Sequence, residues 1–242
     1  MSIAGSTVAL VTGAAGGLGR ATLARLRERG WQLVAWDRAL AEIPCAAPLS
    51  AMSVDVTDEA AVQAGVRRIV EELGRLDHVV HLAGAAGRGP IDVVSRAEWQ
   101  QLLDVNLTSA FLLAKASHEA LARSRGSLVL MASTNALNGG SALSGPAYAV
   151  AKAGIVNLTR YLAKEWAAEG IRVNALAPGP IDTPMVSGRF DPPTIDALRR
   201  AVPLGRLGRA EEVAHAIDYL VSPAAGFVTG TVMNVSGGLA LD

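Results

Sequence analysis

Short apolar runs alternate with longer stretches of helical periodicity along most of this chain. Strands that alternate with helices pair in parallel, because each crossover returns the chain to the same end of the sheet. Right-handed crossovers then place helices on both faces. We therefore predict an α/β fold with one doubly wound domain over residues 1–242 and a seven-stranded parallel sheet. The strands are expected at Thr7–Thr12, Gln32–Trp36, Met52–Val54, Asp77–Leu82, Ser127–Ala132, Ile171–Leu176 and Thr231–Val235.

The segments between these runs divide into helices and two irregular stretches. Ile43–Ser50 contains two prolines and is expected to be a surface loop. Pro178–Arg206 is broken by repeated prolines and glycines, and residues 184–206 within it are expected to form a substrate lid over the carboxyl ends of the strands. The alternative is an ordinary long surface connection, which is uncommon in compact domains. Helices are expected at Leu18–Arg29, Asp58–Leu73, Glu98–Leu121, Ala147–Ala168 and Ala210–Leu220.

Charge and cysteine content argue against several classes of partner. The chain carries 22 Lys and Arg against 22 Asp and Glu without a basic stripe, so we expect no nucleic-acid partner. Cys45 is the only cysteine, which suits a reducing compartment. No apolar run approaches the ~18 residues of a membrane span, and no basic region of a secretory signal opens the chain. We expect a cytoplasmic protein without a membrane partner, and without a metal site, because His78 and His81 lack companion ligands.

A glycine-rich turn follows the first expected strand and opens the first helix, with the sequence Thr-Gly-Ala-Ala-Gly-Gly-Leu-Gly over residues 12–19. Gly13, Gly17 and Gly19 let the backbone turn tightly and approach a pyrophosphate, and Leu18 lies in the same turn. The helix N-terminus then offers free N–H groups and the positive end of its dipole. In this context the turn predicts a dinucleotide-binding (Rossmann) fold rather than a simple tight connection.

Residues at the ends of the next strands refine this prediction. Asp37 ends the second strand, where a carboxylate can accept both hydroxyls of an adenosine ribose and repels a 2′-phosphate, so we predict NAD rather than NADP. Asp55 and Val56 follow the third strand, where an adenine would lie; Asp55 is equally suited to cap the next helix. Ala83 and Gly84 are small residues after the fourth strand, which would let the cofactor ribose pass close to the backbone.

Tyr148 and Lys152 stand four residues apart in an expected helix, so their side chains leave the same face. An ammonium beside a phenol favours the phenolate and lowers the tyrosine pKa from its ordinary value of about 10. Such a pair is common by itself, and each residue has a purely structural alternative. Combined with the glycine turn and with Ser133 directly after the fifth strand, it predicts hydride-transfer chemistry.

These motifs, in this order, resemble the short-chain dehydrogenase/reductase family over nearly the whole chain. The resemblance implies an oxidoreductase that transfers a hydride between a nicotinamide cofactor and a small secondary alcohol or ketone. The resemblance and the carboxylate of Asp37 together predict an NAD-dependent enzyme. The matching elements are residues 12–19, Asp55, Ala83 and Gly84, Asn106, Ser133, Tyr148, Lys152, Asn174, Pro178 and Gly179, residues 181–183, and Gly237 and Gly238.

The resemblance implies a role for each matched residue near the reacting carbon. Tyr148 would be the general acid/base. Lys152 would lower the Tyr148 pKa and bind the nicotinamide ribose. Ser133 would hold the substrate oxygen, and Asn106 would hold a water that links Lys152 to solvent. A residue could fill each position for structural reasons alone, but the set taken jointly favours catalysis.

The cofactor carboxamide would meet Ile181 and Thr183, above a turn shaped by Pro178, in the same resemblance. The chain departs from the family at His81 and Leu82, where two asparagines usually precede Ala-Gly. A hydrogen bond that usually steadies the central sheet is therefore lost or is made by His81 instead.

A second departure is the longer stretch between Ser133 and Tyr148, which carries Ser141 and Ser144. Either could compete for the serine role. We assign the role to Ser133 because it directly follows the strand.

The sequence does not identify the substrate. Arg88 and Arg189 are expected to be solvated at the surface rather than to bind a carboxylate or phosphate.

Two other functions stay open. A 3-oxoacyl-thioester reductase of the same family would use NADPH, against which Asp37 argues. A non-catalytic nucleotide-sensing protein on this fold would not need the complete catalytic set.

Quaternary structure is inferred from the helix at Ala147–Ala168, which is apolar on more than one face, and from the apolar end of the chain at residues 238–241. We expect a homotetramer, as is common in the family.

Overall fold

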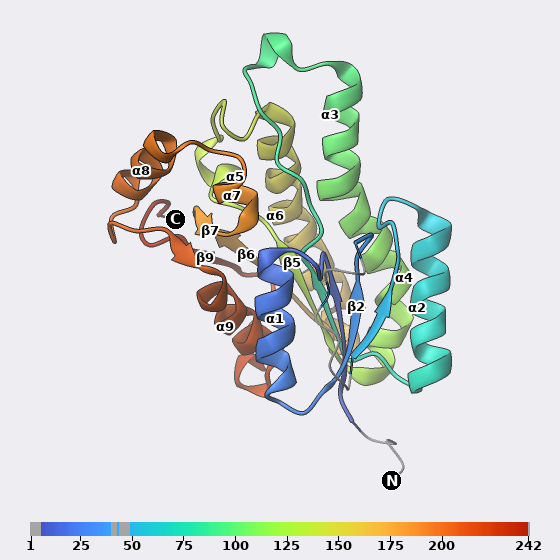
Figure 1. Cartoon of the computed structure of the whole chain (residues 1–242). Helices are drawn as coiled ribbons and strands as arrows, with labels where there is room; N and C mark the ends of the chain where they lie inside the picture. Colours follow the sequence, from blue (N-terminus) through green and yellow to red (C-terminus); the bar gives the residue numbers. More distant parts are fainter. Residues whose placement is uncertain (1–5, 40–42, 44–48, 242) are drawn as a thin grey trace.

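The computed structural model describes residues 6–39, 43 and 49–241. Within that part of the chain, seven parallel strands form one sheet in the order β3-β2-β1-β4-β5-β6-β9 (Figure 1). The predicted doubly wound, seven-stranded sheet is confirmed. The order reverses between β1 and β4, where sheets of this type bind ligands beyond the carboxyl ends of the strands. The strands of this sheet are β1 (Val8–Thr12), β2 (Gln32–Trp36), β3 (Leu49–Met52), β4 (His78–His81), β5 (Ser127–Met131), β6 (Arg172–Pro178) and β9 (Val232–Val235).

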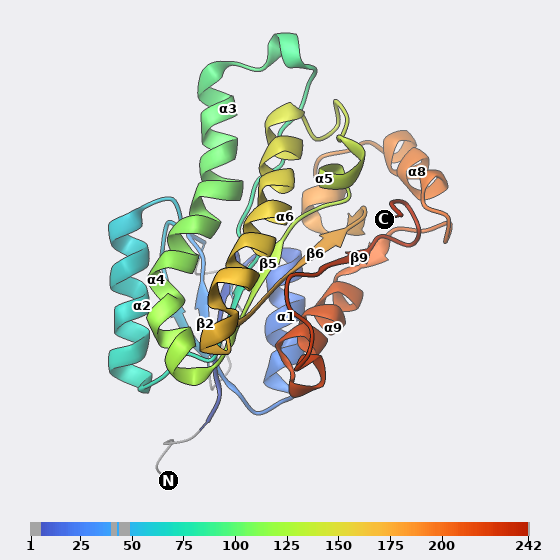
Figure 2. The same cartoon turned by 180° about the vertical axis from the view of Figure 1, so that it is seen from behind.

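Helices connect the strands and cover both faces of the sheet, as the two opposite views show (Figures 1 and 2). Two short strands, β7 (Ile181–Asp182) and β8 (Gly208–Arg209), pair with each other beside this sheet. The α-helices are α1 (Gly17–Arg27), α2 (Glu59–Leu73), α3 (Arg96–Leu103), α4 (Ser109–Ser124), α5 (Asn135–Asn138), α6 (Pro146–Trp166), α7 (Pro184–Ser187), α8 (Pro192–Ala201) and α9 (Ala210–Val221).

Strand β1 shows why both faces of the sheet are covered. All of its residues are buried. Val8 and Leu10 belong to a hydrophobic cluster with α2, α4 and α6, whereas Ala9 and Val11 belong to a second cluster with α1 and α9. Successive side chains of a strand point to opposite faces, so a strand with apolar residues at every position must be buried on both.

The third strand lies earlier in the chain than predicted. β3 pairs with β2 from Leu49 to Met52, whereas the prediction placed it at Met52–Val54. Val54 is buried after the strand has ended, so its apolar character indicated burial and not strand. The expected surface loop Ile43–Ser50 is also wrong in part, because its last two residues belong to β3 and Ile43 is buried. Residues 44–48 of that loop, including Cys45, lie outside the described part.

The long helix predicted at Glu98–Leu121 is composite. Helices α3 and α4 are joined by a π-helical turn over Asp104–Thr108, in which the N–H of Ser109 bonds to the carbonyl of Asp104. A π turn inserts one residue into the helical ladder and rotates the residues after it. Asn106 lies in this turn. Apolar periodicity does not reveal such an insertion, so the sequence prediction of one helix missed it.

Residues 184–206 are more ordered than their prolines suggested. They contain α7 and α8, which lie near the end of the molecule where the strands finish (Figure 1). All residues of α8 are described, and none of them is buried. The segment is bracketed by the pairing of β7 with β8. Its action as a substrate lid stays a prediction.

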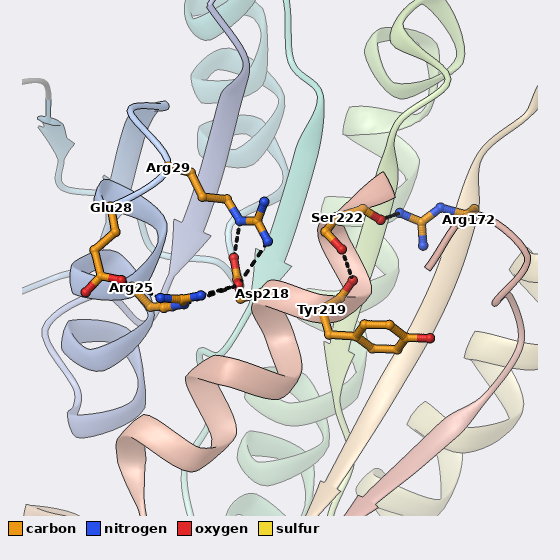
Figure 3. A network of polar contacts seen from close by, with 7 residues as sticks. All are labelled: Arg25, Glu28, Arg29, Arg172, Asp218, Tyr219 and Ser222. Atoms are coloured by element: carbon orange, nitrogen blue, oxygen red, sulfur yellow. Dashed lines mark hydrogen bonds and ion pairs between the residues drawn. The ribbon is translucent and has the colours of Figure 1, made fainter. Parts of the chain in front are cut away.

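A buried carboxylate ties α1 to α9 on one face of the sheet (Figure 3). Asp218 on α9 accepts hydrogen bonds from Arg25 at 3.0 and 3.2 Å, and it also binds the guanidinium of Arg29. Nearby, Arg172 of β6 donates to the Leu220 carbonyl at 2.7 Å, at the end of the same helix. These bonds fix α9 against the sheet below the carboxyl ends of the strands.

Candidate active site

The glycine turn packs against the end of β4, backbone to backbone. Gly13 has φ +66°, and a Cβ there would lie 2.7 Å from the backbone nitrogen of Ala83. A Cβ at Gly19 would overlap the carbonyl of Gly13, and one at Gly17 would lie 2.9 Å from Cγ2 of Thr183. A side chain at Gly13 or Gly19 would therefore displace the backbone, and one at Gly17 would displace the side chain of Thr183. The turn has the shape that a pyrophosphate cradle needs, with the N-terminus of α1 directly behind it.

Asp37 lies at the end of β2, beside this turn. Its carboxylate accepts the backbone N–H of Ala15 at 3.0 Å and that of Ala39 at 3.0 Å. One bond reaches into the glycine turn itself, so the carboxylate is held at the position that the sequence analysis assigned to the adenosine ribose.

Asp55 does not cap α2. Its carboxylate accepts the backbone N–H of Thr57 at 2.9 Å and the Thr57 hydroxyl at 2.7 Å, and these bonds lower its pKa. Asp58 caps the helix instead, by accepting the N–H of Ala61 at 3.1 Å. Of the two alternatives left open for Asp55, the helix cap is therefore wrong. The side chain faces Arg38 at 3.7 Å.

A cavity of about 1150 Å³ runs along the carboxyl ends of the strands. Its walls include six of the fourteen residues predicted to bind the cofactor, together with Met185 and Arg189 of the predicted substrate region. Tyr148, Lys152 and Ser133 are not among its lining residues, although Pro146 and Ala147, which precede Tyr148, are. The predicted cofactor residues that line it are Gly13, Asp37, Asp55, Val56, Ala83 and Gly84.

The phenol of Tyr148 lies beside the hydroxyl of Ser133. Burial raises the pKa of the Tyr148 phenol above its ordinary value, while the bond to Ser133 and the charge of Arg189 act in the opposite direction. Ser144 is occupied elsewhere, because its hydroxyl donates to the Ser141 carbonyl at 3.0 Å. Ser133 is the candidate serine whose hydroxyl interacts with the Tyr148 phenol. Its assignment to the substrate oxygen stays a prediction.

Lys152 is buried on the same face of α6. Its Nζ lies 5.5 Å from the centre of the Tyr148 ring and donates to the carbonyl of Met131 at 2.7 Å. Burial lowers the pKa of Lys152 to about 8. The expected lowering of the Tyr148 pKa is not found in the protein alone, because burial of the phenol outweighs the favourable contacts.

The π turn directs Asn106 toward the loop that follows β4. The Asn106 amide donates to the carbonyl of Ala85 at 2.8 Å and to that of Leu102 at 2.9 Å, and it accepts the N–H of Ala85 at 3.3 Å. A Cβ at Gly84 would lie 2.7 Å from Oδ1 of Asn106 and 3.7 Å from Nζ of Lys152. Asn106 and Lys152 therefore both lie beside Gly84. The predicted water between Asn106 and Lys152 stays a prediction.

His81 takes over the sheet-stabilising bond. Its Nδ1 lies 2.8 Å from the Thr12 hydroxyl of β1, and its Nε2 lies 2.9 Å from the Ser109 hydroxyl of α4. Because Ser109 donates to the Val105 carbonyl, it must accept from Nε2–H, and Nδ1 is left to accept from Thr12. Burial, with the charge of Lys152, lowers the pKa of His81 to about 3, so the imidazole is neutral.

The remaining predicted cofactor residues lie around the same end of the sheet. Pro178 ends β6, and its carbonyl accepts the N–H of Thr134 at 3.1 Å. Ile181 is buried, and Thr183 lies against Gly17 of the glycine turn. Leu18 packs on the cluster beneath α1. The structure therefore brings the two ends of the sequence pattern, residues 13–19 and 178–183, into contact.

One residue was placed wrongly by the sequence analysis. Arg189 is half-buried instead of solvated at the surface: it lines the cavity and donates to the carbonyls of Gly87 and Leu143. No sequence signal marks it, because its partners are backbone groups of two distant loops. Arg88, in the first of these loops, is exposed as expected.

The chain is similar to known proteins over most of its length. A family model described as enoyl-(acyl carrier protein) reductase matches residues 13–240. The chain belongs to the short-chain dehydrogenase/reductase family. Members of this family are oxidoreductases that bind a nicotinamide cofactor, and the cradle of Gly13, Gly17 and Gly19 fits such a group.

Among the relatives of this short-chain dehydrogenase/reductase, one is 41% identical over 96% of this chain and 95% of its own: the cis-4-hydroxycyclohexanecarboxylate dehydrogenase of Sinomonas cyclohexanicum. The 3-oxoacyl-acyl-carrier-protein reductase of Escherichia coli strain K12 is 34% identical over 96% of both chains. The ligand-free aldohexose dehydrogenase of Thermoplasma acidophilum has a similar structure, with a TM-score of 0.88 and 32% identity over 97% of this chain and 94% of the other.

Two further features concern the part of the chain that the structure describes. No helix there is long and apolar enough to span a bilayer. No group of three or more His, Cys, Asp or Glu side chains in the same residues is arranged to hold a metal ion.

Proposed function

We propose that the protein is an NAD-dependent dehydrogenase that interconverts a small secondary alcohol and its ketone. The observation that carries this proposal is the meeting of the Tyr148 phenol with the Ser133 hydroxyl and the Lys152 ammonium, next to a cavity that extends to Asp37. A non-catalytic nucleotide sensor would not require this set.

Each residue then has one task. The phenolate oxygen of Tyr148 takes the hydroxyl proton in alcohol oxidation, and the phenol returns it in ketone reduction. The Ser133 hydroxyl holds the same substrate oxygen, since it lies beside the phenol. When bound, the nicotinamide cofactor accepts or supplies the hydride. Lys152 holds positive charge near Tyr148 and the nicotinamide ribose, and Asn106 stands between Lys152 and the loop after β4, where a water can carry the proton outward.

NAD is preferred because of Asp37. Its carboxylate is fixed by two backbone N–H groups at the end of β2, so it cannot swing away from an incoming 2′-phosphate without breaking both bonds. Arg38, the residue after Asp37, faces Asp55 at 3.7 Å. An NADPH-dependent 3-oxoacyl-thioester reductase is the second candidate, because relatives at 34% identity carry that reductase name.

The region around the site supports two further parts of the proposal. Residues 184–206 act as a lid, since they form exposed short helices beside the cavity and contribute Met185 and Arg189 to its wall. We also propose that the chain forms a homotetramer and acts in the cytoplasm. Phe111, Val150 and Tyr161 on α4 and α6 are large side chains left exposed in the single chain, which supports association between subunits.

Absorbance at 340 nm tests the proposal directly. The protein is mixed with NAD⁺ or NADP⁺ and a panel of cyclic hydroxy acids, polyols, aldohexoses and 3-hydroxyacyl thioesters. We expect reduction of NAD⁺ with at least one alcohol, and a loss of turnover of about 10²- to 10⁴-fold in Tyr148→Phe. Full activity of Tyr148→Phe would overturn the mechanism, and equal or better kinetics with NADP⁺ would overturn the assignment of Asp37.

A further inference from the structure

Two arginines lie at the end of the cavity away from Asp37. Arg88 follows β4 in the loop that leads to α3, and Arg189 follows α7 in the 184–206 segment. Both side chains line the cavity, together with Met185 of α7. They are about a hundred residues apart in sequence, so the fold and not a local motif brings them together.

Two hydrogen bonds hold the guanidinium of Arg189 in place, but they use only one of its three nitrogens. Its Nη2 group donates to the carbonyls of Gly87 and of Leu143, the latter at 2.8 Å. Among the described residues, neither Nε nor Nη1 has a hydrogen-bond partner. Holding a long side chain in one conformation costs side-chain entropy. The two carbonyl contacts offset this cost and fix the remaining N–H groups at the cavity wall.

Among the described residues, neither arginine forms an ion pair, although Glu98 and Asp104 also line the cavity. In the described part of the chain, no carboxylate lies within 4 Å of either guanidinium. The charge of Arg88 acts on Glu98 at longer range. One oxygen of the Glu98 carboxylate, Oε2, accepts the backbone N–H of Ser95 at 3.1 Å and its hydroxyl at 2.9 Å. Burial and the charge of Arg88 both lower the pKa of Arg189, the sign of a cation that is poorly compensated.

The position of the pair relates it to the reacting group. Arg189 is near enough to Tyr148 for its charge to favour the phenolate. A small molecule whose hydroxyl meets Tyr148 and Ser133 could therefore place a second polar group against Arg189. An anion suits this position best, because Arg189 is half-buried and Arg88 adds a second positive charge beside it.

We propose that Arg189, assisted by Arg88, binds a carboxylate of the substrate, so that the enzyme acts on secondary alcohols or ketones that carry a carboxylate remote from the reacting carbon. The inference rests on the proposed function and adds the substrate class to it. Arg189 is the specificity-determining residue, and Arg88 adds charge from the opposite loop.

Matched pairs of an acid and its methyl ester test the proposal. Initial rates with NAD⁺ are measured for 3-hydroxybutyrate and 4-hydroxycyclohexanecarboxylate and for their esters. We expect Arg189→Gln to lower kcat/KM for the preferred acid by about 10- to 100-fold, with its ester changed by less than about threefold. Arg189→Lys should retain part of the preference, and Arg88→Gln should lose less than Arg189→Gln.

The control variant is Arg200→Gln, which removes one exposed positive charge from α8 in the same segment. It should leave the ratio of acid to ester unchanged. Equal losses on acid and ester in Arg189→Gln would show that Arg189 only fastens the lid, and would overturn the inference. So would a wild-type enzyme that does not prefer the acids to the esters.

Calorimetry separates failure of the inference from failure of the proposed function. Cyclohexanecarboxylate and cyclohexanecarboxamide are titrated into wild type and Arg189→Gln in the presence of NAD⁺. Binding of the acid that is lost in Arg189→Gln supports the inference even if no alcohol is oxidised. Equal binding of acid and amide overturns it, and competition by inorganic phosphate as strong as that by the acid overturns its restriction to carboxylates.

Discussion

The two ends of the cavity are built in different ways. At the cofactor end, around Gly13, Gly19 and Asp37, backbone meets backbone: the glycine turn touches the end of β4, and the carboxylate is held by main-chain N–H groups. At the substrate end, around Arg88 and residues 184–206, a long side chain bridges two loops and the helix beside it buries none of its described residues.

This difference determines what each end can tolerate. Backbone packing leaves no room for a side chain, so the cofactor end is fixed by residue type at particular positions. Side chains that bridge exposed loops can be exchanged without moving the sheet. Relatives named for a cyclic hydroxy acid, a 3-oxoacyl group and an aldohexose share the fold, which fits a constant cofactor end and a variable substrate end.

The largest expected effect is that of Gly19→Ala. The added Cβ would overlap the carbonyl of Gly13 and lie 2.6 Å from Cα of Ala14, so the turn must open. We expect a loss of about 3 kcal/mol in unfolding free energy and a loss of NAD binding of more than about 100-fold. Urea denaturation and fluorescence titration with NADH measure the two effects.

Gly205→Ala is the matched change at the substrate end. Gly205 has φ +71°, but a Cβ there would meet nothing within 4 Å, so only backbone strain of about 1 kcal/mol is expected. NADH binding should be unchanged. If the two variants bind NADH equally weakly, the contrast between the two ends is wrong.

Replacement of Ser133 comes next in size. Ser133→Ala removes the hydroxyl beside the Tyr148 phenol, and we expect kcat/KM to fall by about 10²-fold without a comparable loss of stability. Ser144→Ala is the control, because its hydroxyl serves only its own loop through the Ser141 carbonyl and N–H. A larger loss of turnover in Ser144→Ala or Ser141→Ala than in Ser133→Ala would reassign the serine.

The sequence predicted the cofactor end better than the substrate end for the same reason. Gly13, Gly19 and Asp37 are recognisable by residue type and by their spacing after apolar runs, because backbone geometry restricts which residues fit. Arg189 cannot be recognised in this way, since its partners are backbone carbonyl groups, which any residue supplies. The misplaced β3 and the π turn at Asn106 show the same limit: apolar periodicity reports burial, but it does not report where a strand stops or where a helix gains a residue.

The buried imidazole between β1 and α4 gives an effect of intermediate size, visible in the pH dependence of stability. His81 titrates at about 3 in the folded protein, against an ordinary value of 6.5. The unfolded chain therefore takes up a proton first as the pH falls, so stability is full above pH 6.5 and is lost below it. At pH 5 the loss is about 2 kcal/mol for His81 alone.

Comparison of unfolding free energies at pH 7.5 and 5 tests this effect. His81→Asn restores the residue type that the family usually has there, and it should flatten the pH dependence by about 2 kcal/mol. The half-buried His78, whose pKa is lowered to about 4 by partial burial, remains in that variant and keeps part of the slope. His215→Asn, an exposed change, should leave the slope as in wild type. An unaltered slope in His81→Asn would mean that His81 takes up a proton in the folded protein as readily as in the unfolded chain, and would contradict its lowered pKa.

The smallest expected effect compares two helix caps. Asp58 accepts the N–H of Ala61 at the start of α2, and Asp191 accepts the N–H of Thr194 at the start of α8, both at 3.1 Å. α2 buries residues in the core, so Asp58→Ala should lower the global unfolding free energy by about 1 kcal/mol.

None of the described residues of α8 is buried, so loss of its cap should fray that helix without lowering the global stability. In Asp191→Ala we expect faster hydrogen exchange over residues 192–201 and a raised KM for the alcohol, with NADH affinity unaltered. Because α8 lies in the segment assigned as the lid, its fraying should loosen substrate binding alone. A global loss of stability as large as in Asp58→Ala would show that the substrate end is part of the cooperative core, and the division between a fixed and a variable end would then fail.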